Sequence, residues 1–570
     1  MKKIFLVLAI IMLSFACFGQ KNAKGTVDTT YDHGSNITFP ELTPQVIDNL
    51  DLLGRIWGFL KYHHPTIAKG QYNWDYELFR MLPSYLQQTN TQQRDAYLVK
   101  WILHYGKIPT NKSITPVDST AFIKPDLAWI NSEQLSPKLY NLLTKIYQNR
   151  YQGNKYYVTA NPFGARNAKF THENPYSNMY YPDAGYRLLT VYRYWNMLQY
   201  FFPYKYLTDT DWNDVMKESI PILLKAQDTV SYISAVKQMI AKCDDSHAVV
   251  YSESMRYTLM YNRPPFNVRF LRNDTLVIDS YRNPEKIDEN GPHIGDVITH
   301  INHQPISRLI DSLKPFFSAS NYIGKLNDIS DIIVCQNEPS VNLTFITEGK
   351  TKNASIPLYS FYDLDYSMKT DSICYKLLDN NIGYISMDDI TNKYLNTIKD
   401  TIKGTKGLII DMREYPHEFV QYNLFAFLSD SSTDFCRITS PSLKNPGEFA
   451  FENPIITPAK EGEGYKGQVV ILINEQSGSQ SEFATMLYRK IKNSIVLGSN
   501  SVGADGDVTK VELPGGICTY FSGLGIYYPD GSETQRIGIV PDIYGYPTVK
   551  GIREGRDELL EKAIEIIKNS

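Results

Sequence analysis

An internal repeat constrains the fold of this 570-residue chain more than any other feature of its sequence. Two tryptophans, one tyrosine and two prolines recur in the same order, each 138 residues after its counterpart: Trp57, Tyr62, Pro65, Trp74 and Pro83 against Trp195, Tyr200, Pro203, Trp212 and Pro221. The flanking residues are apolar at helical spacing. The pattern predicts two related helical units within residues 20–110 and 183–262, joined by an ordered but irregular connector at residues 111–182.

After the second helical unit the spacing changes to the alternation of β-strands, as at residues 266–270 and 275–278. Residues 294–303 then combine a Gly-Asp turn with an apolar strand. This turn and strand resemble those of a PDZ domain, a module that binds an extended peptide as an added strand of its sheet. We therefore expect a PDZ-like, β-rich domain at residues 263–350; a hairpin in another small β domain is the alternative.

The C-terminal part has the pattern of a layered α/β domain. Four short apolar runs are suited to strands buried on both faces: 383–386, 408–411, 469–473 and 495–498. Residues 481–491 are long enough for a helix, and residues 558–568 place five apolar side chains on one helical face. The predicted fold class is α+β and multidomain, with an α/β domain at residues 351–570.

Composition and charge exclude several classes of function. Lys and Arg number 58 against 61 for Asp and Glu, and this balance provides no global positive field for nucleic acid or anionic lipid. An aromatic content of 13% describes a folded globular protein rather than a disordered or fibrous one. The six cysteines are widely spaced and match neither a disulfide framework nor a zinc motif. We expect buried thiols, with one bridge as the alternative.

The N-terminus has the features of a secretory signal peptide. Lys2 and Lys3 precede an apolar run at residues 4–13, and small residues follow. Cleavage after Gly19 would export the protein to the periplasm or the outside of the cell. A lipid anchor on Cys17 is the alternative, although a serine stands where a lipobox has leucine. No later segment has the roughly 18 uninterrupted apolar residues of a membrane helix, so we expect no transmembrane segment.

The first candidates for a catalytic residue lie on the turn between the strand 469–473 and the helix 481–491. Ser477, Ser479 and Ser481 lie on this turn. A serine there can project its hydroxyl at the strand end, where the N-terminus of the helix and backbone N–H groups stabilise a developing oxyanion. The alternative is that these serines are only turn and N-cap residues.

The wider domain decides between these alternatives by resemblance. Ser479 with Glu482, the strand end at residues 411–413, the loop 503–506 and the segment 538–542 occur in the order found in C-terminal-processing (tail-specific) serine peptidases. The resemblance extends over about residues 183–568. It implies a ClpP/crotonase-like catalytic domain in which Ser479 is the nucleophile.

Members of this family activate the serine in one of two ways. Where the Ser/Lys branch has its lysine this chain has Ala504, and Lys510 is out of register. The other branch, which includes the tricorn core protease, uses an upstream Ser-His pair, and the chain has Ser246-His247 at the end of the second helical unit. An imidazole can take the serine proton at neutral pH and return it to the leaving amine. The resemblance therefore makes His247 the base.

The same resemblance implies the supporting residues. Ser246 and a late carboxylate would orient the imidazole, but Gln535 stands where glutamate is expected, and Glu533 is an alternative. Backbone N–H groups would form the oxyanion hole, one from Gln480 and one from Tyr415, because the following proline has no N–H. His417, in the same loop as Tyr415, is a rival base.

The predicted function is an exported serine endopeptidase that cleaves peptide or unfolded protein substrates, with PDZ-assisted capture of the substrate. No cofactor, metal or nucleic acid is required. Two alternatives stay open. One is a catalytically impaired pseudo-peptidase that binds peptides or small hydrophobic ligands, supported by the missing glutamate. The other is a surface scaffold whose activity lies in the helical half.

Overall fold

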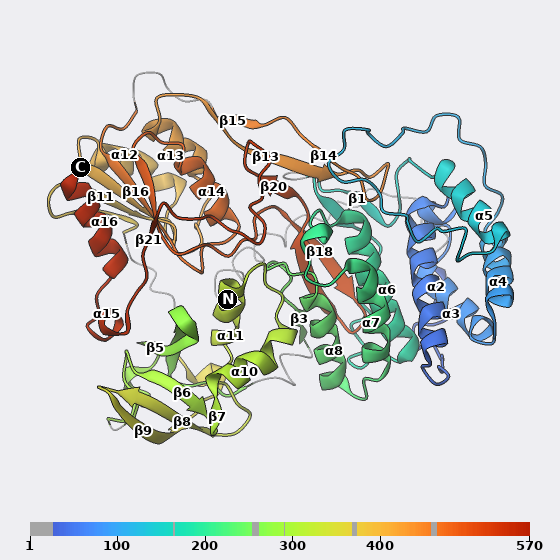
Figure 1. The fold of residues 1–570 in the computed structure, drawn as a ribbon, viewed down its shortest axis with the longest axis horizontal. Coiled ribbons are helices and arrows are strands. Elements are labelled where there is room, and N and C mark those ends of the chain that lie inside the picture. The colour runs from blue at the N-terminus through green and yellow to red at the C-terminus, as the bar shows by residue number, and fades with distance from the viewer. Residues whose placement is uncertain (1–26, 163–165, 254–260, 290, 367–372, 458–463) are drawn as a thin grey trace.

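The computed structural model describes residues 27–162, 166–253, 261–289, 291–366, 373–457 and 464–570. The predicted signal peptide and Cys17 lie outside the described residues. The chain forms three parts, as Figure 1 shows: a helical half in blue and green, a β module in yellow-green, and an α/β domain in orange and red. None of the helices in the described ranges combines the length and apolar character needed to cross a membrane.

Each of the two repeated segments forms three helices. Their bounds are α2 (Pro44–His63), α3 (Trp74–Tyr85) and α4 (Thr91–His104), then α6 (Ala184–Phe201), α7 (Trp212–Leu224) and α8 (Thr229–Ala241). In the first segment the indole N–H groups of Trp57 and Trp74 each donate to the other residue's carbonyl oxygen, at 3.0 and 2.9 Å. Trp195 and Trp212 make the same reciprocal pair, at 2.6 and 3.3 Å. The repeated tryptophans therefore join corresponding helices in the same way.

A buried cluster of charges links the two helical segments to the connector. The ammonium group of Lys61 lies 2.6 Å from Glu173 Oε1, and Arg193 Nε lies 3.0 Å from Glu173 Oε2. Arg193 also pairs with Asp75 on α3. All four side chains are less than one-tenth exposed. Buried charges of this kind are stable only when they are paired, so the cluster fixes α2, α3 and α6 in one arrangement.

The connector contains regular structure that the sequence analysis did not predict. Helix α5 spans Pro137–Gln148, and Val158–Ala160 (β1) pairs with Ala168–Phe170 (β2). The prediction of an irregular connector is wrong at these elements. Helix α5 buries an apolar face that includes Leu139 and Leu143 against the helical core. This packing stabilises the helix, although the flanking Asn, Tyr and Pro residues are typical of loops.

The α/β domain is built on a six-stranded sheet with the strand order β10-β11-β12-β16-β17-β21. Its strands are β10 (Tyr375–Leu378), β11 (Ile382–Ser386), β12 (Gly407–Asp411), β16 (Gln468–Ile473), β17 (Ser494–Gly498) and β21 (Ile543–Tyr544). All neighbours are parallel except β10 and β11. The four predicted strands are confirmed. Because the strands are parallel, the loops after β12, β16 and β17 meet at one edge of the sheet.

Helices cover both faces of this sheet. Helices α12 (Leu395–Ile402), α13 (Gln421–Leu428) and α14 (Gln480–Tyr488) pack on one face. Helix α16 (Glu558–Asn569) packs on the other and buries Leu559, Ala563 and Ile567. Alternate residues of each central strand point into the two cores, as expected for strands buried on both faces. The predicted helices at residues 481–491 and 558–568 are confirmed.

Two smaller sheets attach the α/β domain to the helical half. One has the strands β13 (Thr433–Pro441), β14 (Phe449–Phe451), β15 (Ile455–Thr457) and β20 (Gly525–Tyr527), and the other has β3 (Tyr251–Ser252), β18 (Val508–Leu513) and β19 (Ile517–Ser522). Strand β3 follows the predicted Ser-His pair directly and pairs with β19. The apolar core of the helices includes Val511 and Phe521 of this sheet. The helical half and the α/β domain thus share a core.

The β module is an antiparallel sheet with two helices. Its elements are β4 (Phe266–Leu271), β5 (Thr275–Tyr281), β6 (Val297–Ile301), β7 (Gln304–Pro305), α10 (Ile306–Leu313), α11 (Tyr322–Ser330), β8 (Ser340–Thr347) and β9 (Lys350–Pro357). Strand β9 pairs with β8 along its whole length, so the module extends beyond the predicted boundary at residue 350. The boundary was missed because β9 carries mostly polar side chains on an exposed surface.

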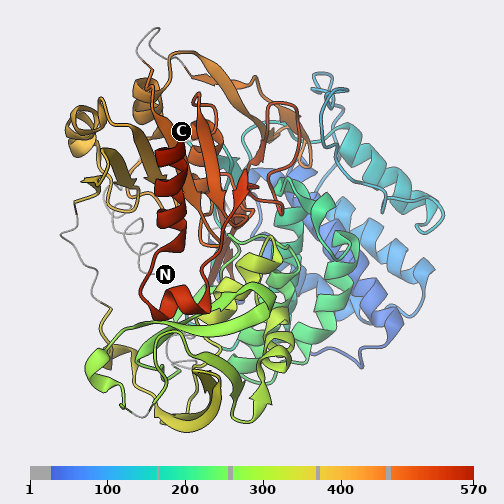
Figure 2. The same cartoon turned by 60° about the vertical axis from the view of Figure 1, so that its left-hand side comes forward.

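The β module also contacts the C-terminal end of the chain. Figure 2 shows α15 (Val549–Arg553) lying against it, below α16. Gly295 has a φ of +84°, and a Cβ placed there would stand 2.6 Å from the Cβ of Arg553. Arg553 donates from Nη2 to the Gly295 carbonyl at 3.0 Å. Glycine is therefore required at this turn both by its backbone conformation and by the approach of α15.

Candidate active site

The three serines after β16 have different surroundings. The hydroxyl of Ser477 donates to the Met412 carbonyl at 2.9 Å, and that of Ser481 to the Glu414 carbonyl at 3.3 Å. These two serines are buried and fix the turn to the loop after β12. Ser479 is the N-cap residue of α14, and its side chain lies close enough to the Tyr415 phenol to lower the pKa of that phenol. The Ser477 hydroxyl also lies 3.4 Å from Asn474 Oδ1, whereas the Ser479 hydroxyl faces the Tyr415 side chain.

The backbone of Ser479 adopts a sparsely populated conformation, with φ 51° and ψ −115°. Non-glycine residues with positive φ persist where the surrounding structure holds them, often at functional sites. Here the N–H of Ser479 donates to the carbonyl oxygen of Ala504 at 2.8 Å. It also lies 3.0 Å from the carboxylate of Glu482. The strained turn thus presents the hydroxyl at the junction of strand and helix, the position of an exposed nucleophile.

Glu482 joins this turn to the loop after β17. Its buried carboxylate accepts the N–H groups of Gly503 at 2.7 Å and Ala504 at 3.0 Å, as well as the hydroxyl of Ser501. Burial raises the pKa of Glu482 above its usual value, against the lowering effect of these bonds. Ala504, which replaces the lysine of the Ser/Lys branch, takes part only through its backbone in these bonds. Lys510 lies on β18, in an exposed ion pair with Glu512.

The loop after β12 covers the N-terminus of α14. Gln480 donates from its side chain to the Glu418 carbonyl at 3.2 Å. The Tyr415 hydroxyl, which lies near the Ser479 side chain, also lies near the backbone N–H of Gln480. Burial raises the pKa of Tyr415, so the phenol is neutral at physiological pH. The side chain of Tyr415, rather than its predicted backbone N–H, therefore approaches the nucleophile in this conformation. His417, the rival base, is exposed on this loop.

His247 is held by two residues that the sequence analysis did not assign. Its Nδ1 lies 2.9 Å from the hydroxyl of Ser522 and 3.4 Å from Asp245 Oδ1. Asp245 is fully buried and also accepts the backbone N–H of Ser522 at 2.6 Å and that of His247 at 3.1 Å. The loop after α8 is therefore fixed to β19, and the ring nitrogen that faces away from these groups, Nε2, is left for proton transfer.

Asp245 controls the charge of the imidazole. Burial lowers the pKa of His247, but the hydrogen bond and the negative charge of Asp245 outweigh it, and the pKa lies above its usual value. Glu482 and Asp507 add to this increase. The pKa of Asp245 is lowered in turn, because its bonds to His247 and Ser522 outweigh the effect of burial. A carboxylate that stabilises an imidazolium is the arrangement expected of a general base.

His247 and Ser479 lie in the same region of the molecule but are not bonded to each other. The negative charge of Glu482, whose carboxylate accepts the N–H of Ser479, raises the pKa of His247. Within the described ranges, no hydrogen bond joins the His247 ring to the Ser479 hydroxyl. Catalytic hydrogen bonds are often formed only when substrate is bound. The Ser479 hydroxyl lies near the Tyr415 phenol instead.

The predicted orienting residues Ser246 and Gln535 meet at Ser320 of the β module. The hydroxyl of Ser246 accepts the Ser320 N–H at 2.8 Å, and the Ser320 hydroxyl accepts the Ser246 N–H at 3.0 Å and Gln535 Nε2 at 3.3 Å. Neither Ser246 nor Gln535 is bonded to the imidazole here. Glu533, the alternative, accepts the hydroxyl of Tyr206 at 2.6 Å. Contacts to the imidazole thus come from Asp245 and Ser522.

Asp245 and Ser522 differ in how far the sequence could have revealed them. Asp245 stands two residues before His247, and a carboxylate so close to a candidate base is a usable signal. Ser522 lies 275 residues away along the chain, and nothing in its local sequence distinguishes it. No cluster of three or more His, Cys, Asp or Glu side chains suited to a metal ion occurs in the described parts of the chain.

Residues 381–544 match the sequence model of peptidase family S41. The chain carries a peptidase family S41 domain. The predicted membership of the C-terminal-processing serine peptidases is confirmed, and the S41 domain is that of a serine peptidase. The matched range contains Ser479, Tyr415 and Gln480, whereas His247 and Asp245 lie outside it. No curated protein sequence matches the chain.

Solved structures resemble this chain over about two thirds of its length. Mature CPAF in complex with lactacystin is 13% identical, with a TM-score of 0.54 over 68% of this chain and 99% of that chain. A putative peptidase from Parabacteroides merdae ATCC 43184 is 16% identical, with a TM-score of 0.42 over 68% and 96%. The tricorn protease is 14% identical, with a TM-score of 0.33 over 68% and 37%. The likeness to mature CPAF shows a shared fold.

Proposed function

We propose that the protein is an exported serine endopeptidase in which Ser479 is the nucleophile and His247 the general base. The observation that supports this most strongly is the strained Ser479, whose hydroxyl stands at the start of α14 inside a family S41 domain. An imidazole held by a buried carboxylate lies in the same region. Asp245 and Ser522 act as positioning residues for that imidazole, and the roles of Ser246 and Gln535 stay predictions.

The proposed reaction uses these groups in two steps. The Ser479 oxygen bonds to the carbonyl carbon of the substrate while its proton passes to Nε2 of His247. The backbone N–H of Gln480 donates to the oxyanion, the C–N bond breaks, and His247 returns the proton to the leaving amine. Water then attacks the acyl-enzyme, again with His247 as base, and releases the carboxylate product and the free Ser479 hydroxyl.

Tyr415 opposes the first step in the ligand-free state. Its hydroxyl lies near both the Ser479 side chain and the Gln480 N–H, which the substrate carbonyl must engage. We expect Tyr415→Phe to raise kcat/KM by about two- to tenfold, because the substrate no longer displaces the phenol hydroxyl from these groups. Steady-state kinetics with a peptide substrate measure this, and Tyr422→Phe is the matched control, with no change expected. A fall in kcat would show instead that the hydroxyl donates to the oxyanion.

Several finer features remain proposals. We propose a ClpP/crotonase-like fold for the α/β domain and a duplication for the two helical segments, whose reciprocal tryptophan pairs support it. We also propose that the β module is PDZ-like and captures peptide. The direct contact of Ser320 with Ser246 supports a link between this module and the active site. Export, with release by cleavage after Gly19, rests on the N-terminal sequence.

A fluorophosphonate probe tests the proposed function. We expect covalent labelling of Ser479, identified by peptide mass spectrometry, and we expect His247→Gln to slow labelling by about 100-fold or more because the serine loses its base. Ser312→Ala, which removes an exposed serine of α10, is the control and should label normally. Labelling of a different serine, or labelling at an unchanged rate in His247→Gln, would contradict the assignment.

A peptide-binding pseudo-peptidase is the second candidate. The contact between the Tyr415 hydroxyl and Ser479, with no bond from Ser479 to His247 in the described ranges, favours it. The probe separates the two candidates, because a pseudo-peptidase would bind peptide saturably and leave Ser479 unlabelled. Retention of both a strained serine and a carboxylate-held imidazole favours the enzyme.

A further inference from the structure

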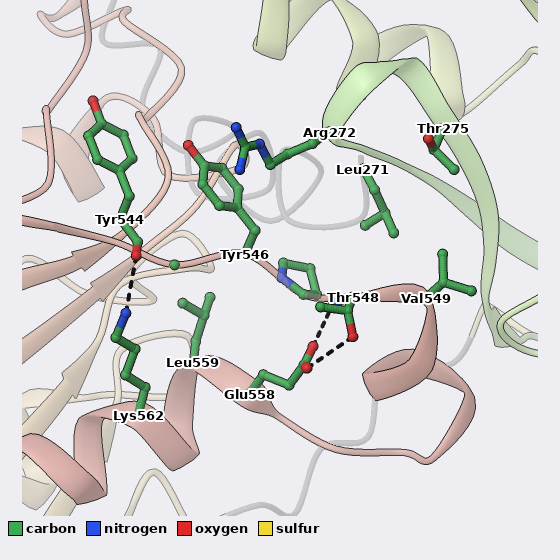
Figure 3. Close-up of a pocket in the computed structure, with 12 residues that line it drawn as sticks. Leu271, Arg272, Thr275, Tyr544, Tyr546, Thr548, Val549, Glu558, Leu559 and Lys562 are labelled. Carbon is green, nitrogen blue, oxygen red and sulfur yellow. Dashed lines mark hydrogen bonds between the residues drawn. The ribbon is translucent and has the colours of Figure 1, made fainter.

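A cavity of about 510 Å³ lies between the β module and the C-terminal part of the S41 domain. Figure 3 shows the residues that line it. The turn between β4 and β5 forms one wall, and the segment from β21 to α15, with the start of α16, forms the other. The volume is that of a small-molecule site. None of the groups proposed for catalysis lines this cavity, so it is separate from the site of Ser479.

Two cations at this cavity have no counter-ion. Among the described residues, neither Arg272 nor Lys562 forms an ion pair. The nearby carboxylates are engaged elsewhere: Glu558 accepts the N–H of Thr548 and also its hydroxyl, at 3.0 Å, and Asp274 accepts the Tyr322 hydroxyl at 2.7 Å. The residues that line the cavity therefore carry two positive charges, Arg272 and Lys562, against the one negative charge of Glu558, and the excess is positive.

Both cations are held in place by the surrounding structure. The guanidinium of Arg272 lies over the ring of Tyr546, 4.9 Å from its centroid, as Figure 3 shows. The turn that follows Arg272 is tight, because Asn273 and Asp274 both adopt positive φ, at 58° and 54°. Lys562 donates to the Tyr544 carbonyl at 3.3 Å, which leaves two of its three N–H donors.

Aromatic and aliphatic groups complete the lining. The rings of Tyr544 and Tyr546 are stacked, with centroids 6.2 Å apart and planes 9° from parallel. Leu271, Val549 and Leu559 contribute apolar surface. Such a lining, with two fixed cations, matches a ligand that joins a negative group to an aromatic or aliphatic one.

We propose that this cavity binds a carboxylate that is attached to an apolar or aromatic group, as in the C-terminal residue of a peptide. Arg272 presents a planar fork of donors that suits a carboxylate better than a point charge does. Lys562 supplies a second charge on the opposite wall, and the tyrosines and leucines contact the apolar group. A bound ligand would touch both the β module and the S41 domain.

The proposed peptidase activity would supply one such ligand, since every cleavage releases a product with a new C-terminal carboxylate. Only this source of the ligand rests on the proposed function. The hydroxyl of Tyr544 donates to Asn500 Oδ1 at 3.1 Å, and Asn500 belongs to the loop after β17. This loop also contains Gly503 and Ala504, whose N–H groups bind Glu482 at the nucleophile turn. The cavity and the active site therefore lie at the same edge of the sheet.

Calorimetric titration of the full chain carrying Ser479→Ala tests the proposal without any need for activity. We expect N-acetyl-phenylalanine to bind at least about tenfold more tightly than N-acetyl-phenylalanine amide, because only the acid pairs with the two cations. Arg272→Gln and Lys562→Gln should each remove most of this preference. Arg308→Gln on α10 and Lys568→Gln on α16 are matched controls. Each removes a cation from the β module or from the C-terminal helix without touching the cavity, and each variant should retain the preference for the acid.

The measured affinities test the proposal and identify the source of the ligand. Equal affinity for acid and amide, no binding of either, or a preference that survives Arg272→Gln and Lys562→Gln together would overturn it. A tripeptide acid ending in phenylalanine that binds more tightly than N-acetyl-phenylalanine would identify a peptide terminus as the ligand. Equal binding of benzoate and the tripeptide acid would identify a free aromatic carboxylate. Because binding is measured with Ser479 removed, a failure here leaves the proposed peptidase untouched.

Discussion

Replacement of Ser479 with alanine is expected to lower kcat for peptide hydrolysis by at least about a thousandfold, because the substrate loses the oxygen that forms the acyl-enzyme. The fold should be retained. The N–H of Ser479 and the carboxylate of Glu482, rather than the hydroxyl, fix the turn to the loop after β17. The measurement is turnover of a quenched fluorescent peptide, together with the thermal midpoint of wild type and variant.

Ser481→Ala is the matched control for this experiment. It removes a neighbouring hydroxyl that is bonded to the Glu414 carbonyl and is not directed at a reacting group. We expect it to retain at least about a tenth of the wild-type kcat, since one backbone hydrogen bond is lost. Turnover that persists in Ser479→Ala but disappears in Ser481→Ala would show that Ser481 rather than Ser479 is the nucleophile. That result would contradict the proposed mechanism.

The sequence predicted those parts of the fold whose signal is local. Strands β11, β12, β16 and β17 were found because each is a short apolar run buried on both faces, and α16 because its apolar side chains recur at helical spacing. The strand-to-helix turn offered three serines, and the family resemblance selected Ser479 among them as the nucleophile, which stays a prediction. In these cases the residues that determine the structure lie within about ten positions of each other, so the pattern is visible in the chain itself.

The remaining features depend on contacts between distant segments. Ser522 and Ser320 are separated from the loop after α8 by 275 and 74 residues, and only the docking of β19 and the β module brings them there. The family resemblance assigned the orienting role to Ser246 and Gln535, and that role stays a prediction. The place of the Tyr415 side chain near Ser479 likewise depends on the packing of this loop against α14, which the local sequence does not determine.

Asp245→Asn is expected to lower kcat/KM by about 10²–10⁴-fold and to move its acidic limb to lower pH. His247 must be neutral to accept the serine proton, so in the wild type activity is lost as pH falls through a pKa that lies above 6.5. Without the charge of Asp245, only the weaker effects of Glu482 and Asp507 oppose burial, so this pKa falls. The measurement is kcat/KM against pH for both proteins.

Ser522→Ala separates charge from hydrogen bonding at the same ring. It removes the 2.9 Å contact to Nδ1 and leaves the carboxylate of Asp245 in place. We therefore expect a loss of about two- to tenfold, with the acidic limb nearly unmoved. A merely structural role for Asp245 would reduce the amount of folded enzyme in both variants but would not shift the pH profile. If the acidic limb of Asp245→Asn coincides with that of the wild type, the pKa that limits activity at low pH does not depend on Asp245. That result would show that a group other than His247 serves as the base.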